Sequence, residues 1–200
     1  MKNLLWGLLA VVAIGVALIG VRSYQVMSVA AEWDGPVAEI LTEKFDKQGD
    51  TMQIEFTSRL DAPVATVMQA FSEPERSQEF SDSVRHSKLL QHEGNRKVIE
   101  LEMLVLGRLQ ESTMAFTFLP DENRVLLETV ENQLTDLRGE YRFTPSQDGT
   151  KTRLTYSGSA KDKAQLPIPL ALQKSAMREA FVSTLRALKK GLAAQDQAQS

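Results

Sequence analysis

The chain contains no cysteine and only two histidines, His86 and His92, among its 200 residues. The lack of cysteine excludes disulfides, thiolate metal sites and thiol nucleophiles together. Two histidines are too few for a histidine-rich metal site, so we expect no metal and no other cofactor. The net charge of −3 is not the strong positive excess typical of nucleic-acid-binding domains, so we expect no nucleic-acid partner. Composition does not indicate an oligomeric state.

Motifs for catalysis are also lacking. The sequence contains no nucleophile elbow, no phosphate-binding glycine loop and no metal-ligand motif. His92 falls in a predicted turn, and His86 falls in a predicted strand whose inward face the pattern does not settle. Glu131 is the nearest acidic candidate. We therefore name no catalytic residue, and enzymatic activity stays an open question.

One long apolar run is present at the start of the chain. Residues 4–21 carry no charge, Lys2 precedes them and Arg22 follows. As a helix the run would be about 27 Å long, enough to cross a bilayer core. We favour an uncleaved single-pass transmembrane anchor at residues 1–22, with the following domain on the extracytoplasmic (periplasmic) side. A signal peptide cleaved after Ala30 and a buried soluble helix are the alternatives.

The rest of the chain is divided by its turn residues. Residues 23–50 are interpreted as a connector, in which residues 37–45 form a short helix that ends at Gly49. Residues 51–194 form the main domain, and residues 195–200 form a polar tail. Removing residues 1–50 is therefore expected to release a folded, soluble domain.

Strand patterns dominate the main domain. Residues 52–60 alternate between apolar and polar, as in a half-buried strand. Asp61 and Pro63 then begin a helix that continues to Phe71, and Pro74 opens a second short helix. Turn signals separate the remaining strands, which implies an antiparallel meander. These strands are expected at residues 84–91, 97–106, 109–119, 124–133, 137–144 and 151–159.

A long amphipathic helix is predicted at residues 169–192. Its apolar stripe has helical spacing, and it comprises Leu170, Met177, Phe181, Leu185, Leu188 and Leu192. A basic face lies opposite, with Arg178, Arg186, Lys189 and Lys190, and faces either water or anionic headgroups. A lone helix after many strands needs a sheet to cover. The expected class is therefore α+β, with a curved antiparallel sheet of about seven strands wrapped around this helix.

This order of elements resembles the helix-grip fold. The similarity is carried by residues 60–63 (LDAP), 139–145 (GEYRFTP), 148–152 (DGTKT) and 166–169 (LPIP), and covers roughly residues 52–192. The chain resembles the superfamily that includes the polyketide cyclase/dehydrase and lipid transport family, the START lipid-transfer domains and the birch-pollen-allergen proteins. The resemblance implies a hydrophobic ligand held between sheet and helix, with catalysis in only some members.

Strand alternation and helix spacing predict which residues line that space. A mainly apolar wall with a few polar anchors suits a lipid-like ligand. The predicted ligand-binding residues are Met103, Met114, Phe116, Tyr141, Phe143, Tyr156, Lys174, Met177 and Phe181. The alternative is that these side chains simply fill the core, with each tyrosine hydroxyl bonded internally. Lys174 either meets an acidic ligand head at the cavity mouth or extends into water.

We therefore expect a membrane-anchored domain that binds a hydrophobic small molecule, such as a lipid or isoprenoid. Two other functions remain open. One is a cyclase- or dehydrase-type enzyme acting on an aromatic or polyketide-like substrate, for which an inward-facing His86 would be evidence. The other is an envelope interaction module whose core is filled.

Overall fold

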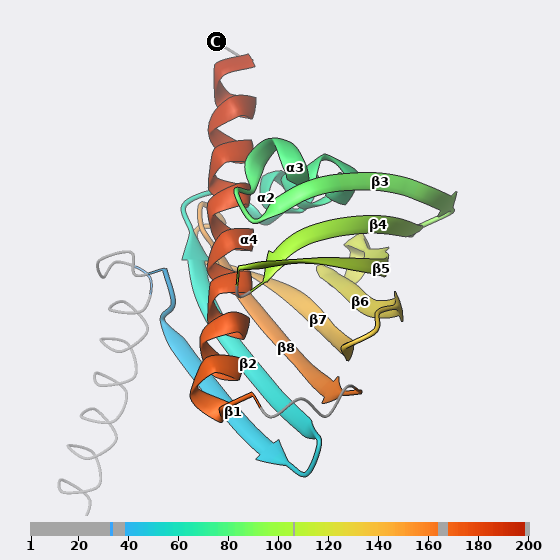
Figure 1. Ribbon diagram of the computed structural model, residues 1–200. Helices are drawn as coiled ribbons and strands as arrows, with labels where there is room; N and C mark the ends of the chain where they lie inside the picture. The colour runs from blue at the N-terminus through green and yellow to red at the C-terminus, as the bar shows by residue number, and fades with distance from the viewer. Residues whose placement is uncertain (1–32, 34–38, 106, 164–167, 199–200) are drawn as a thin grey trace, which may run out of the picture. The chain divides into compact units, whose positions relative to one another are not determined.

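The computed structural model describes residues 33, 39–105, 107–163 and 168–198, with side chains up to Ala194 (Figure 1). The residues from Ala38 onward form one compact unit. None of the helices within these described ranges is long and apolar enough to cross a membrane. The expected anchor at residues 1–22 lies outside the described residues, and so does most of the expected connector.

The fold is an eight-stranded antiparallel sheet with a long helix at the end of the chain, which confirms the predicted fold class. The strand order is β1-β2-β8-β7-β6-β5-β4-β3, so the last strand of the meander pairs with β2. The strands are β1 (Thr42–Gln48), β2 (Thr51–Leu60), β3 (Val84–Glu93), β4 (Arg96–Val105), β5 (Arg108–Leu119), β6 (Arg124–Glu131), β7 (Thr135–Pro145) and β8 (Thr152–Asp162).

The helices lie together on one side of the sheet (Figure 1). They are α2 (Val64–Phe71), η1 (Pro74–Arg76), α3 (Ser77–Phe80) and α4 (Leu170–Ala198), whereas the short turn η2 (Pro120–Glu122) joins β5 to β6. Both α2 and α3 pack against α4. The two short helices after the second strand were predicted, whereas α4 continues beyond its predicted end into the expected polar tail.

The helix predicted at residues 37–45 is wrong, because residues 42–48 form strand β1. Gly49 has a left-handed φ of 61°, and the turn it allows joins β1 to β2 as a hairpin. Phe45 packs edge-on against Phe56, with 5.3 Å between ring centroids. The strand was missed because all residues of β1 except Phe45 are exposed, so the segment shows no apolar alternation. Its addition raises the predicted seven strands to eight.

The second half of α4 supplies its buried face. Phe181, Val182, Leu185 and Leu188 are all buried, and Leu185 has no exposed surface. Leu170 was predicted to continue this stripe, but it is 41% exposed. Every residue from 170 to 180 stays at least partly exposed. The stripe therefore contacts the sheet firmly only from Phe181 onward.

Three inward-facing rows of side chains cross β2, β8 and β7, and the pairing register defines them. The tyrosine row contains Phe56, Tyr156 and Tyr141; the glycine row contains Ile54, Gly158 and Gly139; the alanine row contains Met52, Ala160 and Leu137. Their members are paired directly across neighbouring strands. The rows follow one another toward the end of β8, so the inward positions of β8 after Tyr156 are held by the two small residues Gly158 and Ala160.

Because β1 is part of the sheet, a cut at Asp50 removes more than a connector. We predict that a chain beginning at Thr51 has a lower free energy of unfolding than one beginning at Ala38. The loss should be about 3 kcal/mol, the size expected when one aromatic side chain leaves a core. Urea denaturation of the two chains measures this difference. Equal unfolding midpoints and equal slopes for both would show that β1 contributes no stability.

Candidate functional site

The interior between the sheet and α4 is built around aromatic rings. Phe181 stacks on Phe56, with 4.8 Å between ring centroids and an interplanar angle of 17°. The ring centroids of Tyr141 and Tyr156 lie 5.0 Å apart, and those of Phe71 in α2 and Tyr141 lie 4.8 Å apart. Such contacts add to the free energy gained by burying the rings. They also fix the second half of α4 over the tyrosine row.

Most of the predicted ligand-binding residues are gathered in this interior. Those in the buried core are Met114, Tyr141, Phe143, Tyr156 and Phe181. Those partly buried and packed against it are Met103, Phe116 and Met177. Their common location was predicted from strand alternation and helix spacing. Their role as ligand contacts stays a prediction.

Lys174 lies apart from this group, toward strand β1. Its ammonium nitrogen is 5.3 Å from the centroid of the Phe45 ring, in the geometry of a cation–π contact. The side chain is half-buried. Lys174 therefore neither extends freely into water nor points among the core aromatics, and its contact with an acidic ligand head stays a prediction.

Contacts with β1 show which part of the sheet the first turns of α4 cover. The Lys47 ammonium donates a hydrogen bond of 2.9 Å to Oε1 of Gln173, and Lys47 pairs with Met52 of the alanine row. Phe45, under Lys174, pairs with Ile54 of the glycine row. The turns before Phe181 thus lie beside β1, next to the ends of the glycine and alanine rows that hold Ile54 and Met52.

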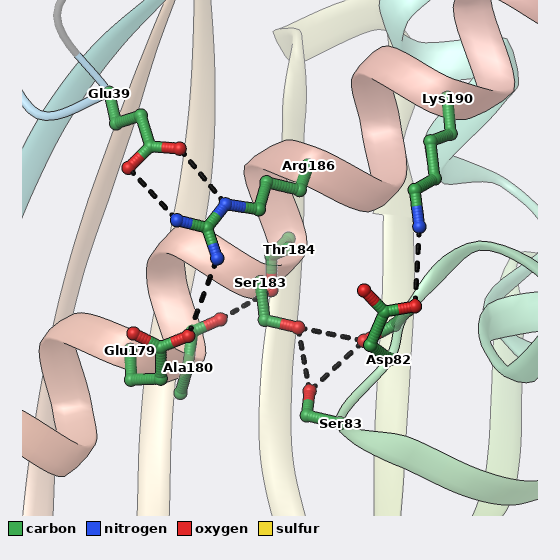
Figure 2. A network of polar contacts seen from close by, with 10 residues as sticks. Glu39, Asp82, Ser83, Glu179, Ala180, Ser183, Thr184, Arg186 and Lys190 are labelled. Carbon is green, nitrogen blue, oxygen red and sulfur yellow. Dashed lines mark hydrogen bonds and ion pairs between the residues drawn. The ribbon is translucent and has the colours of Figure 1, made fainter.

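The two interior tyrosines differ in how their hydroxyls are satisfied. The side chain of Thr184 is a hydrogen-bond partner of the Tyr141 hydroxyl. The Thr184 hydroxyl in turn donates to the carbonyl of Ala180 at 3.0 Å (Figure 2). The Tyr156 hydroxyl is buried and has no hydrogen-bond partner among the described residues. Burial raises the pKa of Tyr141 to about 12 and also raises the pKa of Tyr156. Both phenols therefore stay protonated at neutral pH.

The two glycines of the glycine row leave the space that the Tyr156 ring occupies. A Cβ atom on Gly158 would lie 2.5 Å from the Tyr156 hydroxyl oxygen, and one on Gly139 would lie 2.9 Å from it. Such distances are well inside normal contact, so these two positions require the absence of a side chain. The phenol ring consequently lies over the glycines instead of standing up toward α4.

Neither of two surface hollows in the described part of the chain is lined by the core aromatic rings. One, of about 350 Å³, is formed by residues 39–43 with Arg178 and Val182 of α4. The other, of about 380 Å³, lies on the outer face of the sheet beside Gln53, Arg138 and Glu140. A ligand in the interior therefore requires side chains, or the first turns of α4, to move.

The predicted basic face of α4 is largely neutralised by acidic partners (Figure 2). Arg186 forms ion pairs with Glu39 and Glu179, and its hydrogen bond lowers the pKa of the Glu39 carboxyl. Arg178 pairs with Glu43. Lys190 lies 3.3 Å from Asp82. The face is thus tied to residues 39–43 on one side and to the segment between α3 and β3 on the other.

The same segment makes a cluster of hydroxyls with α4. The Ser183 hydroxyl lies 2.7 Å from that of Ser81 and 2.6 Å from that of Ser83. These contacts, with those of Arg186 and Lys190, hold the middle of α4 in place. The first two turns have fewer described ties, mainly those of Gln173 and Lys174.

Comparison with known proteins agrees with this architecture. Residues 51–193 match the family model described as polyketide cyclase / dehydrase and lipid transport. The chain belongs to this family. No curated protein matches it.

Several solved structures share the family's fold. The Zhui aromatase/cyclase from a Streptomyces species has a TM-score of 0.64 at 15% identity, over 72% of this chain and 94% of its own. A START superfamily protein from Mycobacterium smegmatis has a TM-score of 0.59 at 17% identity, over 74% and 99%. A STAR-related lipid transfer protein from Xanthomonas axonopodis has a TM-score of 0.57 at 17% identity, over 76% and 98%. At these identities the likeness shows the fold alone.

The residues considered for catalysis lie outside the interior. His86 and His92 are exposed on β3, an edge strand of the sheet, and Glu131 is exposed at the end of β6. The described part of the chain holds no group of three or more His, Cys, Asp or Glu side chains that could bind a metal ion. An inward-facing His86, which would have been evidence for an enzyme, is therefore not observed.

Sequence reasoning missed two polar contacts at the edges of the interior. Lys97 of β4 donates to Glu75 at 2.7 Å and to the carbonyl of Ser72 at 2.9 Å, which fastens the turn after α2 to the sheet. Lys97 continues the inward alternation of Ile99 and Leu101, so its position could have been recognised. No sequence pattern of this kind indicates that Thr184 is the hydrogen-bond partner of Tyr141.

Close approach at the glycine row leads to a first prediction for this site. Gly158→Ala should lower the free energy of unfolding by roughly 1–3 kcal/mol, as overpacking does. Gly191→Ala is the matched control: its nearest neighbour would be 3.9 Å away, and alanine favours a helix. It should raise stability by roughly 0.5–1 kcal/mol. Urea unfolding of both variants checks this, and no loss in Gly158→Ala would contradict the close approach.

The buried phenols also predict a dependence on alkaline pH. Folding raises the pKa of Tyr141 from 10.0 to about 12, so above pH 10 the unfolded chain loses this proton first. The contribution of the protonated Tyr141 hydroxyl to the free energy of unfolding is fully present below pH 10 and is lost as pH rises toward 12. Each such tyrosine should steepen the decline by up to about 1.4 kcal/mol per pH unit.

Urea titrations at a series of pH values from 9 to about 11.5 measure this effect. The Tyr141→Phe/Tyr156→Phe double variant should lose less stability over that range than the wild type, because it lacks both phenols. Identical declines in the two proteins would mean that these hydroxyls are not buried.

Proposed function

We propose that this protein binds a hydrophobic small molecule, lipid- or isoprenoid-like, between the sheet and the first turns of α4. The observation that carries the proposal is incomplete packing at that place. Residues 170–180 stay at least partly exposed, and their described contacts with the sheet are those of Gln173 with Lys47 and of Lys174 with Phe45. An apolar ligand there would bury the surface that these elements leave uncovered. Family membership, which includes lipid transport, is consistent with this function.

We further propose that residues 4–21 anchor the chain in a membrane as a single-pass helix, with the binding domain on the extracytoplasmic side. The support is the sequence itself, an uncharged apolar run between Lys2 and Arg22. An anchored domain would receive its ligand from, or return it to, the membrane to which it is attached.

The filled-core interaction module remains the second candidate, and one observation favours it. Neither described hollow is lined by the core aromatic rings. In that case the contacts of the core aromatics would serve stability only, and a protein partner would contact the surface.

Native mass spectrometry distinguishes ligand binding from the filled-core module. It is applied to the wild-type full chain and to the Met177→Trp variant, each extracted gently from its host membranes. Met177 is half-buried among the first turns of α4, so a tryptophan there would occupy the proposed ligand space. We expect the wild type to carry a hydrophobic molecule and the variant to lose it. The free energy of unfolding should change by less than about 1 kcal/mol, because Met177 is only half-buried and the larger ring need not displace the packed core.

Leu188→Trp is the matched control in the fully packed half of the helix. Leu188 is buried, so the larger ring should cost roughly 1–3 kcal/mol. An equal cost in Met177→Trp, together with a wild type that carries no bound molecule, would support the filled-core module instead.

A further inference from the structure

The buried hydroxyl of Tyr156 is not explained by the fold alone. Its residue is only 6% exposed, and the oxygen has no partner among the described residues. Burying a hydroxyl without a hydrogen bond is unfavourable, and such groups are rare in folded proteins. A phenylalanine would pack the same ring without that penalty. The hydroxyl therefore calls for a partner that comes from outside the described chain.

The sequence makes room for this hydroxyl at two positions. Gly158 and Gly139 are paired across β8 and β7, and a Cβ atom on either would collide with the phenol. The ring thereby extends from the tyrosine row over the glycine row, along the inner face of the sheet. The hydroxyl lies beside the place where we propose that the ligand binds.

Tyr141 shows what an internally satisfied hydroxyl looks like in the same interior. It lies next to Tyr156, but it is bonded to Thr184, which passes the hydrogen bond on to a helix carbonyl. Tyr141 thus has a structural partner, whereas Tyr156 does not.

The charged side chains nearest this interior are already engaged. Lys174 lies over Phe45, Arg178 pairs with Glu43, and Lys97 pairs with Glu75. A carboxylate or phosphate moved beside Tyr156 would lose its hydration and gain only a neutral donor. A neutral oxygen loses far less on burial, and a phenol can either donate to it or accept from it.

We propose that the Tyr156 hydroxyl hydrogen-bonds a neutral oxygen of the ligand, so that the ligand is a long apolar molecule with a hydroxyl or carbonyl group. Fatty acids and phosphate-headed lipids are thereby disfavoured. This inference rests on the proposed function, and it assigns to Tyr156 the selection among hydrophobic ligands.

Three photoreactive probes of equal chain length test this assignment: diazirine derivatives of tetradecanol, tetradecanoic acid and tetradecane. The full chain is placed in phosphatidylcholine vesicles and irradiated, and labelled peptides from β8 and α4 are quantified at increasing probe concentration. Comparing variants in identical vesicles cancels the partitioning of each probe into lipid.

For the wild type we expect tetradecanol to label these peptides at a lower half-saturating concentration than tetradecanoic acid. In Tyr156→Phe that concentration should rise about fivefold for tetradecanol, the effect of losing one neutral hydrogen bond. It should stay within about twofold for tetradecane. Tyr156→Phe removes only an unpartnered oxygen, so it should fold at least as well as the wild type.

Tyr141→Phe is the matched control, since its hydroxyl already has a partner and it should bind tetradecanol almost as the wild type does. Unchanged tetradecanol labelling in Tyr156→Phe would overturn the inference and leave the proposed function standing. Preference for tetradecanoic acid, lost in Lys174→Met, would also overturn it by placing a charged head at Lys174. Absence of labelling by all three probes would overturn the proposed function and this inference with it.

Discussion

The stacking of Phe181 on Phe56 determines where α4 lies on the sheet. Phe56 is paired with Tyr156, so this one contact sets the helix over the tyrosine row. The helical rise then places the preceding turns beside strand β1, and it brings Arg178 to Glu43. A slip of one helical turn would separate all of these pairs. The ring stack is therefore the contact on which both the closed core and the open end depend.

The two halves of α4 consequently have different tasks. From Phe181 onward the helix is buried on one face and held by polar contacts on both sides, through Arg186 and through Ser183. Before Phe181 it lies beside strand β1 and is only partly buried itself. Local opening takes place where few buried contacts must be broken. A ligand could thus enter beneath the first turns while the rest of the fold stays intact.

Much of this architecture could be predicted from the sequence, because alternation and helical spacing report directly on burial. The inward placement of Tyr141, Phe143 and Tyr156 followed from strand alternation, and that of Phe181 from the helix stripe. Strand β1 could not be predicted in this way, because within it only Phe45 packs against the core and its spacing of four residues from Leu41 also fits a helix. Leu170 shows the opposite error: its spacing fits the apolar stripe, but the residue is 41% exposed at the start of α4.

The different states of the two tyrosine hydroxyls could not be predicted either. Tyr141 and Tyr156 occupy equivalent positions on neighbouring strands, and only the three-dimensional contacts show that Thr184 satisfies one of them. Membership of the family gives the fold, and the fold alone does not give a ligand. In this chain the added observation is a buried hydroxyl, that of Tyr156, which has no partner among the described residues and lies over a pair of glycines.

Amide hydrogen exchange of α4 in the full chain tests the central claim most directly, because it compares the two halves of one helix. The account predicts that residues 170–180 exchange at least about tenfold faster than residues 181–188, since their opening breaks fewer buried contacts. It also predicts that added tetradecanol slows exchange in the first segment only. Equal protection along the whole helix, unchanged by tetradecanol, would contradict a ligand site beneath its first turns.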